Sequence, residues 1–138
     1  MSKRRVVVTG MGMVSPLGNT VDETWGNILE GKSGVATIEA FDVSELGTQF
    51  AASVKNLDVS EYYSAKDAKR QDLFIQYGLV AGIQAIQDAG LEITEEQADR
   101  VGVAIGSGIG GLPNIESNRD LYRDKGPKRI PPFFIPGS

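Results

Sequence analysis

The chain has 138 residues, of which 41% are hydrophobic and 23% charged, so its length suits one globular domain with a core. Its formal net charge of −4 argues against general nucleic-acid binding. The absence of cysteine and histidine excludes disulfides, thiol nucleophiles, Cys/His zinc sites and imidazole acid–base catalysis within these residues. No apolar run is long enough for a membrane span or a signal peptide, so we expect a cytoplasmic protein.

The first predicted element in chain order is a strand at residues 5–9. Val6–Val8 is a continuous β-branched run with no polar face, which favours a central strand buried on both sides. A helix is expected over residues 21–30, because Thr20 and Glu23 have the spacing of a capping box. Its inward-facing side chains are predicted to be Trp25, Ile28 and Leu29.

The middle of the chain is predicted to be irregular, with a short extended piece at residues 50–54. Asp58 and Ser64 are plausible N-caps for two short helices. A long helix is predicted over residues 72–89, with apolar side chains on more than one stripe. We therefore expect this helix to be buried around much of its circumference.

A second strand is predicted at residues 101–105, after another capping-box pattern at residues 94–97. Its apolar residues alternate with small ones, which favours burial on both faces. The strand leads into Gly106–Gly111, where Ile109 is the one bulky side chain. A buried strand that ends in a glycine loop is where open α/β sheets place their chemistry.

The chain closes with a predicted polar helix at residues 114–123, a basic turn at 126–129 and a proline-rich apolar tail. The order strand, helices, strand, helix predicts an α/β fold with parallel strands. Two strands do not make a stable sheet by themselves, so both need neighbours. We expect the chain to be the front portion of a larger protein.

The glycine loop also fits the spacing of the dinucleotide-binding fingerprint at Gly106, Gly108 and Gly111. In that interpretation a pyrophosphate lies at the start of the following helix. The fingerprint normally follows the first strand, and an acidic residue closes the next strand, whereas residues 112–138 contain no such strand. A dinucleotide-binding α/β module therefore remains the less favoured alternative.

Five segments resemble one known family: RRVVVTGMGMVSPLGNTVDETW at 4–25, GKSGV at 31–35, and the stretches 72–94, 100–112 and 126–138. They cover essentially the whole chain in register. The chain resembles the N-terminal part of the elongating β-ketoacyl-[acyl-carrier-protein] synthases, most closely the bacterial synthase II type. The resemblance implies that residues 1–138 are the N-terminal part of the ketosynthase N-terminal half, without the remainder that carries the catalytic residues.

The resemblance implies a thiolase-like α/β fold, a mixed sheet covered by helices, in a homodimer that needs no cofactor. It also implies fatty-acid chain elongation, in which an acyl group passes from acyl carrier protein to a cysteine thiolate. Malonyl-carrier protein then loses carbon dioxide, and the carbanion attacks the thioester. The family uses one cysteine and two histidines, and its cysteine lies beyond the position of Ser138. We therefore expect this chain to be inactive by itself.

The resemblance also implies roles for four apolar or small residues. Ile109, with Gly108 beside it, is expected to line the acyl pocket and limit its depth. Phe133 and Phe134 are expected at the dimer interface, with Phe134 reaching toward the acyl pocket of the partner. Plain core packing is the alternative for Ile109 and for both phenylalanines.

Two basic clusters are the candidate docking surface for the acidic carrier protein, namely Lys66, Lys69 and Arg70, and Lys128 with Arg129. The first three have the i, i+3, i+4 spacing of one helix face. The alternative is an ordinary solvated face. For the whole chain, a non-catalytic ketosynthase-like partner that sets chain length is the alternative function.

Overall fold

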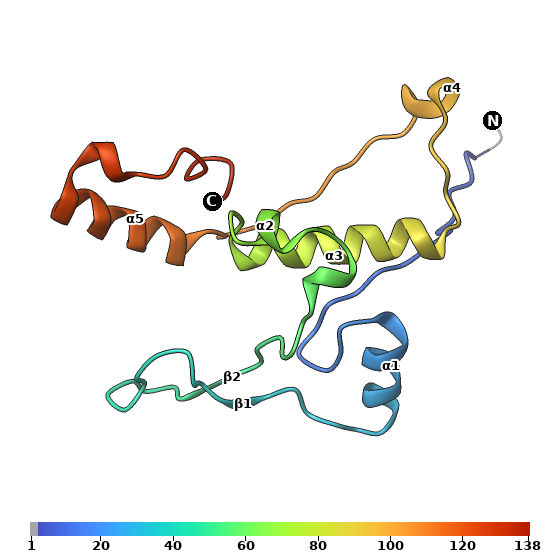
Figure 1. Ribbon diagram of the computed structural model, residues 1–138. Helices are drawn as coiled ribbons and strands as arrows, with labels where there is room; N and C mark the ends of the chain where they lie inside the picture. Colours follow the sequence, from blue (N-terminus) through green and yellow to red (C-terminus); the bar gives the residue numbers. More distant parts are fainter. Residues whose placement is uncertain (1–2) are drawn as a thin grey trace. The chain divides into compact units, whose positions relative to one another are not determined.

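The computed structural model describes residues 3–138 (Figure 1), and these divide into two compact units. The first unit contains the chain up to Leu57 and residues 81–90, and the second contains residues 58–80 and 91–138. The longest helix, α3 (Leu73–Asp88), contributes its first half to the second unit and its second half to the first. Its bounds confirm the long helix predicted from the sequence.

Helix α1 (Val21–Leu29) begins at the predicted cap. The Thr20 hydroxyl accepts a hydrogen bond from the Glu23 amide at 3.2 Å. The Glu23 carboxylate reaches back one residue further than a standard capping box, where it accepts from the Asn19 amide at 2.7 Å. The Glu23 amide, which the helix leaves without an intrahelical partner, and the Asn19 amide just before the cap are thereby satisfied.

We expect Thr20→Ala to destabilise α1 by about 1 kcal/mol, because the Glu23 amide loses its acceptor. Hydrogen exchange of the α1 amides, measured on the whole chain, checks this and should be about fivefold faster. Thr94→Ala is the matched control: Thr94 caps the short helix α4 (Glu95–Ala98) without a side-chain hydrogen bond. Equal effects of the two substitutions would contradict the assignment of Thr20.

The segment before α1 lies along the second half of α3 within the first unit. The Met11 amide donates to Asp88 Oδ2 at 2.8 Å, and the Met13 amide donates to Gln84 Oε1 at 3.0 Å. Gly12 lies between them, and a Cβ there would collide with the backbone of α3. Glycine is required here because the two backbones approach so closely.

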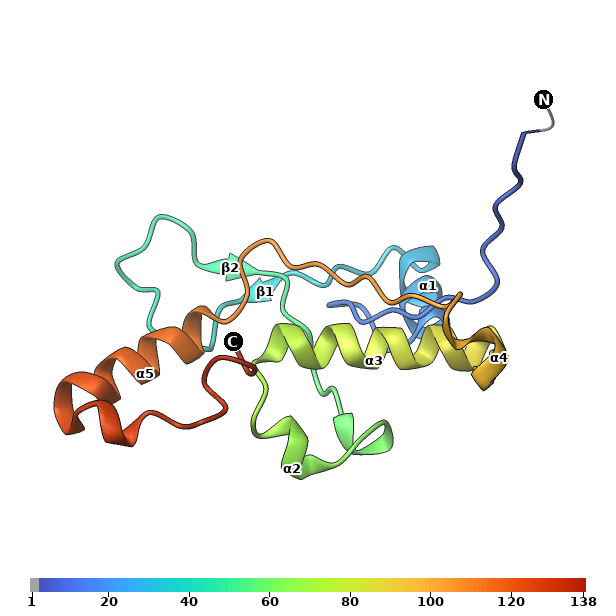
Figure 2. The ribbon, with the colours of Figure 1, turned by 90° about the horizontal axis from the view of Figure 1, so that it is seen from above.

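The sheet is small. Strands β1 (Ala36–Thr37) and β2 (Phe50–Ala51) pair antiparallel, with Ala36 opposite Ala51 and Thr37 opposite Phe50 (Figure 2). The predicted extended piece at 50–54 is confirmed over its first two residues. The expected mixed sheet covered by helices is not formed by residues 3–138, because β1 and β2 are the only strands in this part of the chain.

Both predicted central strands are wrong for the described residues. Residues 5–9 and 101–105 pair with no strand. Val6 and Ile105 are 88% and 61% exposed instead of buried. The sequence pattern correctly marks apolar, extended segments, but a strand also needs a neighbour to accept its hydrogen bonds, and residues 3–138 supply none.

The second unit contains the first half of α3, the longer helix α5 and several short helices. The predicted caps are confirmed: Asp58 accepts from the Ser60 amide at the start of η1 (Val59–Glu61), and Ser64 accepts from Asp67 at the start of α2 (Ala65–Ala68). Two hydrogen bonds to the Asp58 carboxylate lower its pKa, the larger effect coming from the Ser60 hydroxyl and the smaller from the Ser60 amide. Helix α5 (Leu112–Lys125) and η2 (Pro127–Arg129) follow the glycine loop.

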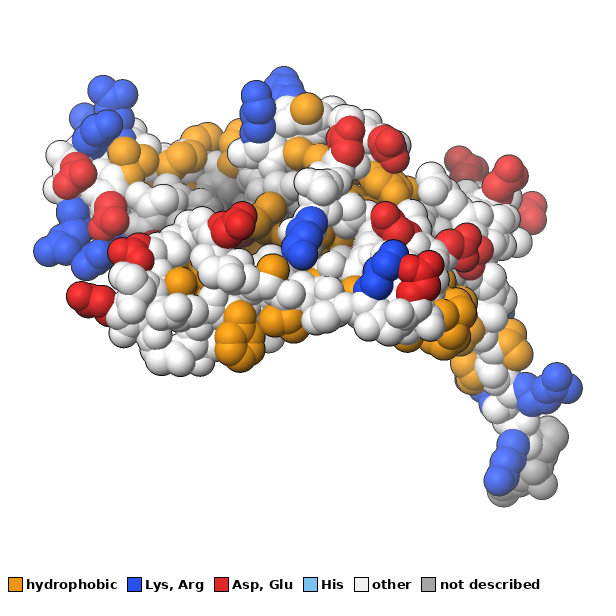
Figure 3. All heavy atoms as spheres, turned by 90° about the horizontal axis from the view of Figure 1, so that it is seen from below, with side chains coloured by type: hydrophobic (Ala, Val, Ile, Leu, Met, Phe, Trp, Pro, Cys, Tyr) orange, Lys and Arg blue, Asp and Glu red, His pale blue; other side chains and the backbone are white. Residues whose placement is uncertain are grey.

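The core of the described chain is thin. Val43, Ala68 and Val80 are its buried apolar residues, so the expected burial of α3 around its circumference is wrong. Many hydrophobic side chains lie on the surface, as Figure 3 shows for one face. The side chains predicted to face inward from α1 are also exposed: Trp25, Ile28 and Leu29. Within residues 3–138, no helix has the length and apolar character of a membrane span.

Candidate functional site

The glycine loop has one exposed bulky side chain. Ile109 is 81% exposed, so plain core packing does not describe it within residues 3–138. Beside it, a Cβ at Gly110 would lie 2.6 Å from the Phe74 ring. Gly111 has φ +75° and stands at the N-cap of α5, a conformation that side chains rarely adopt. Small residues thus bring the loop close to α3, and Ile109 projects from it.

An apolar cavity of about 420 Å³ lies between the first half of α3 and the start of the glycine loop. The approach is close at Gly78, where a Cβ would stand 3.3 Å from Ile105 Cγ2. Burial raises the pKa of Tyr77 above its ordinary value. The lining residues carry no formal charge, so the cavity suits an apolar chain: Phe74, Ile75, Tyr77, Gly78, Leu79, Ile105, Gly106 and Ser107.

Sequence reasoning did not single out the helix side of this cavity. Phe74 and Tyr77 belong to the apolar stripes of the predicted helix at residues 72–89, and the sequence pattern does not indicate which segment they face. Gly78, next to Tyr77 and one turn after Phe74, predicts a close approach of another segment to the helix, and Ile105 is the residue found there. Ile109 lines neither this cavity nor the one described next.

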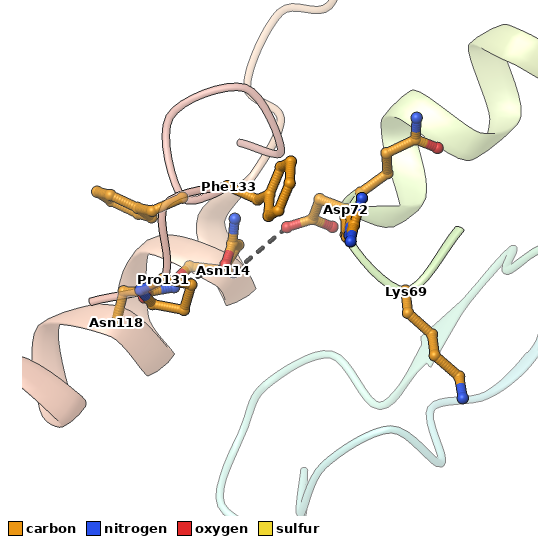
Figure 4. Close-up of a pocket in the computed structure, with 9 residues that line it drawn as sticks. Lys69, Asp72, Asn114, Asn118, Pro131 and Phe133 are labelled. Atoms are coloured by element: carbon orange, nitrogen blue, oxygen red, sulfur yellow. Dashed lines mark hydrogen bonds between the residues drawn. The ribbon is translucent and has the colours of Figure 1, made fainter. Parts of the chain in front are cut away.

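A second cavity, of about 250 Å³, lies beside the turn after η2 (Figure 4). Phe133 and Phe134 both line it; Phe133 is 43% exposed and Phe134 is half-buried. The Arg70 guanidinium lies over the Phe133 ring, 4.1 Å from its centroid. The other lining residues are Lys69, Gln71, Asp72, Asn114, Asn118 and Pro131.

The structure divides the first basic cluster. Helix α2 ends at Ala68, so Lys66 lies in the helix, Lys69 caps it and Arg70 follows it; the prediction of one helix face is wrong. Lys66 and Lys69 are exposed and have no ion-pair partner among residues 3–138, whereas Arg70 stands 3.9 Å from Asp67 and over Phe133. Arg70 is therefore less available to an external partner than the two lysines.

The second basic cluster, Lys128 and Arg129, lies in η2 and is exposed. Neither side chain forms an ion pair with any residue from 3 to 138. Both remain available to an acidic partner.

The local structure does not support the dinucleotide-binding alternative. Its fingerprint requires a strand ahead of the glycines, and residues 101–107 form none. The helix that follows is α5, which carries only one buried residue, the polar Asn118. Among the described residues there is also no cluster of three acidic side chains that could hold a metal ion.

Comparison with known proteins identifies the family to which this chain is similar. Residues 3–138 match the model of the family described as beta-ketoacyl synthase, N-terminal domain. The chain is 61% identical over 138 residues to 3-oxoacyl-[acyl-carrier-protein] synthase 2 of Vibrio harveyi. It is 57% identical over the same length to the synthase 2 of Vibrio cholerae, and 52% identical to that of Coxiella burnetii. All three alignments cover the whole of this chain and 33% of the relative.

A solved structure has the same fold. The ishigamide ketosynthase/chain length factor superposes with a TM-score of 0.75 at 26% identity, over 97% of this chain and 34% of that chain. The similarity confirms the thiolase-like fold class implied by the sequence resemblance, whereas residues 3–138 by themselves do not form the mixed sheet. The chain spans about a third of the length of the relatives that it matches.

Proposed function

Because the chain belongs to the beta-ketoacyl synthase N-terminal domain family, we propose that it is the N-terminal part of a condensing enzyme for fatty-acid elongation. The carrying observation is the match over the whole chain to synthases that act, by name, on acyl-carrier-protein substrates. In this proposal the full-length protein forms an acyl-enzyme thioester and condenses it with decarboxylated malonyl-carrier protein. The thiolate required for that step lies outside these residues, which contain no cysteine.

The glycine loop forms the wall of the acyl pocket in this proposal. Ile109 is exposed and is the one bulky apolar side chain in the loop, because its neighbours, Gly108 among them, are glycine or serine. Burying each methylene of an acyl chain contributes about 0.8 kcal/mol, so a side chain that limits depth selects chain length. The uncharged cavity beside Gly106 supports an apolar substrate.

The exposed cations form the docking surface for the carrier protein. Lys66, Lys69, Lys128 and Arg129 have no acidic partner among the described residues, which leaves their charge available to an acidic protein. Arg70 takes a smaller share, because Phe133 and Asp67 already engage it.

The turn after η2 forms part of a homodimer interface. Phe133 and Ile135 are 43% and 77% exposed, an apolar surface that a partner subunit would cover. Phe134 is half-buried beside them and reaches the acyl pocket of the partner in this proposal.

A chimeric synthase tests the pocket assignment. This chain replaces the matching third of the Vibrio harveyi relative, and Ile109→Phe is introduced. We expect the longest accepted acyl primer to become shorter, with kcat/KM falling about 10- to 200-fold for each methylene beyond the new limit. Steady-state kinetics over a series of acyl-carrier-protein primers measures the effect.

Ile93→Phe is the matched control, because Ile93 is 49% exposed and lies outside the glycine loop. It should leave the primer series unchanged. An Ile109→Phe profile that matches the parental one would remove Ile109 from the acyl pocket.

The structural match favours one second candidate. The solved relative is titled a ketosynthase/chain length factor, so a non-catalytic partner that shapes a chain-length tunnel is compatible with this fold. The two candidates differ in whether the remaining segment of the protein contains the reactive cysteine. Sequencing the full-length protein, and alkylating it with iodoacetamide in the presence and absence of acyl-carrier protein, separates them.

A further inference from the structure

Three distant segments of the second unit meet at the turn that carries the two phenylalanines. We call Asp72, Asn114, Asn118 and Ser138 the clasp. The Asp72 amide donates to the Gly137 carbonyl at 3.0 Å, and the Asn114 side-chain amide donates to the same carbonyl at 3.2 Å. The chain after α5 folds back along that helix to reach these partners (Figures 1 and 2).

Asp72 serves the starts of two helices. Its Oδ1 accepts from the Leu73 amide at 2.6 Å, at the beginning of α3, and its Oδ2 accepts from the Asn114 amide at 3.3 Å, in the first turn of α5. Figure 4 shows the second bond between the two residues. The N-cap of α5 is Gly111, which has no side chain, so Asp72 supplies a carboxylate where the helix has unpaired amides.

The side chain of Asn114 has one orientation. Asn118, only 7% exposed, donates its amide to Asn114 Oδ1 at 2.7 Å, and the Nδ2 of Asn114 faces the turn, where the Gly137 carbonyl can only accept a hydrogen bond. That Nδ2 donates to Ser138 Oγ at 2.7 Å as well as to Gly137. The Ser138 hydroxyl in turn donates to the Phe134 carbonyl, which ties the clasp to the phenylalanine itself.

Arg70 holds the other side of the same turn. Its guanidinium covers the Phe133 ring at 4.1 Å, a cation–π contact. Its carbonyl lies directly against Gly137, where a Cβ would collide with it. Residues 70–72 therefore contact the turn in three ways. The Arg70 guanidinium lies over the Phe133 ring, the Arg70 carbonyl packs against Gly137, and the Asp72 amide donates to the Gly137 carbonyl.

We propose that the clasp is a positioning device that sets where Phe134 stands, so that Asp72 and Asn114 determine acyl-chain selection without contacting substrate. The consequence for selection rests on the proposed function, while the positioning itself does not. Because Arg70 follows Lys66 and Lys69 in the chain and lies over the Phe133 ring, the same contacts link the proposed docking surface to the turn that carries Phe134.

The first arm of the test measures positioning in the full-length chimera, in which this chain replaces the matching third of the Vibrio harveyi relative. Asn114→Ala and Asp72→Asn should accelerate hydrogen exchange in the 133–138 turn about tenfold, and should speed chymotryptic cleavage after Phe134. Asp120→Asn is the matched control, because Asp120 is an exposed α5 carboxylate whose ion-pair partner among residues 3–138 is Arg119. Exchange no faster than in the control overturns the proposal, whatever the activity.

The second arm uses the chimera with the Vibrio harveyi relative. Asn114→Ala should change kcat/KM for long primers relative to short ones by about tenfold. Asn114→Gln, which keeps the amide donor, should restore part of the profile. A faster-exchanging turn with an unchanged primer profile overturns the link to acyl selection. If Ile109→Phe also leaves that profile unchanged, the acyl-pocket assignment of Ile109 has failed and the positioning stands; an inactive but folded chimera is the outcome that contradicts the proposed function.

Discussion

The purified 138-residue chain is expected to form no β-ketoacyl product from acyl- and malonyl-carrier protein. The proposed reaction needs a thiolate to hold the acyl group, and donors to stabilise the enolate that follows decarboxylation. The chain has no cysteine and no histidine, and no other side chain in it can form the thioester. Mass spectrometry of the reaction mixture tests whether β-ketoacyl product forms. The chain is assayed at about a thousand times the concentration used for a full-length synthase.

Two controls make this prediction informative. The full-length Vibrio harveyi relative should be active, and the chimera that carries this chain in place of the matching third should keep activity within about tenfold. Condensation by the 138-residue chain would refute the need for a thiolate. An inactive but folded chimera would instead show that these residues do not fit a condensing enzyme.

Gly137→Ala is expected to release the turn after η2. The added Cβ would collide with the Arg70 carbonyl oxygen and would lie 2.8 Å from the Phe133 carbonyl oxygen. Both neighbours are backbone atoms, so the turn must move, at a cost of about 1–3 kcal/mol or more. The movement also breaks the bond from the Asp72 amide to the Gly137 carbonyl. Hydrogen exchange of the Asp72 amide should therefore accelerate at least tenfold.

Gly102→Ala is the matched control for this prediction. A Cβ at Gly102 would meet nothing within 4 Å, so the substitution should leave the turn unchanged. Chymotryptic cleavage after Phe133 or Phe134 reports the same event independently of hydrogen exchange. Equal behaviour of the two variants would show that Gly137 is not required by close packing.

Local elements could be predicted because their causes lie within a few residues. Thr20 and Ser64 each accept from an amide three residues ahead, and both begin the helices that their spacing indicates. Thr94 shows the limit of the pattern: it stands at the start of α4 but makes no side-chain bond. The family resemblance was equally accessible, because it depends on residue order and not on contacts.

Residue order by itself therefore determined the longer helices, the caps at Thr20, Asp58 and Ser64, and the family to which the chain belongs. The tertiary structure decided that Val6 and Ile105 are exposed, because burial of a strand depends on partners that lie elsewhere. It also decided that Asp72, Asn114 and Gly137, separated by 42 residues and then by 23, share hydrogen bonds. No periodicity encodes such a meeting, since a hydrogen bond requires two groups to be within about 3 Å and sequence spacing constrains that distance only over a few residues.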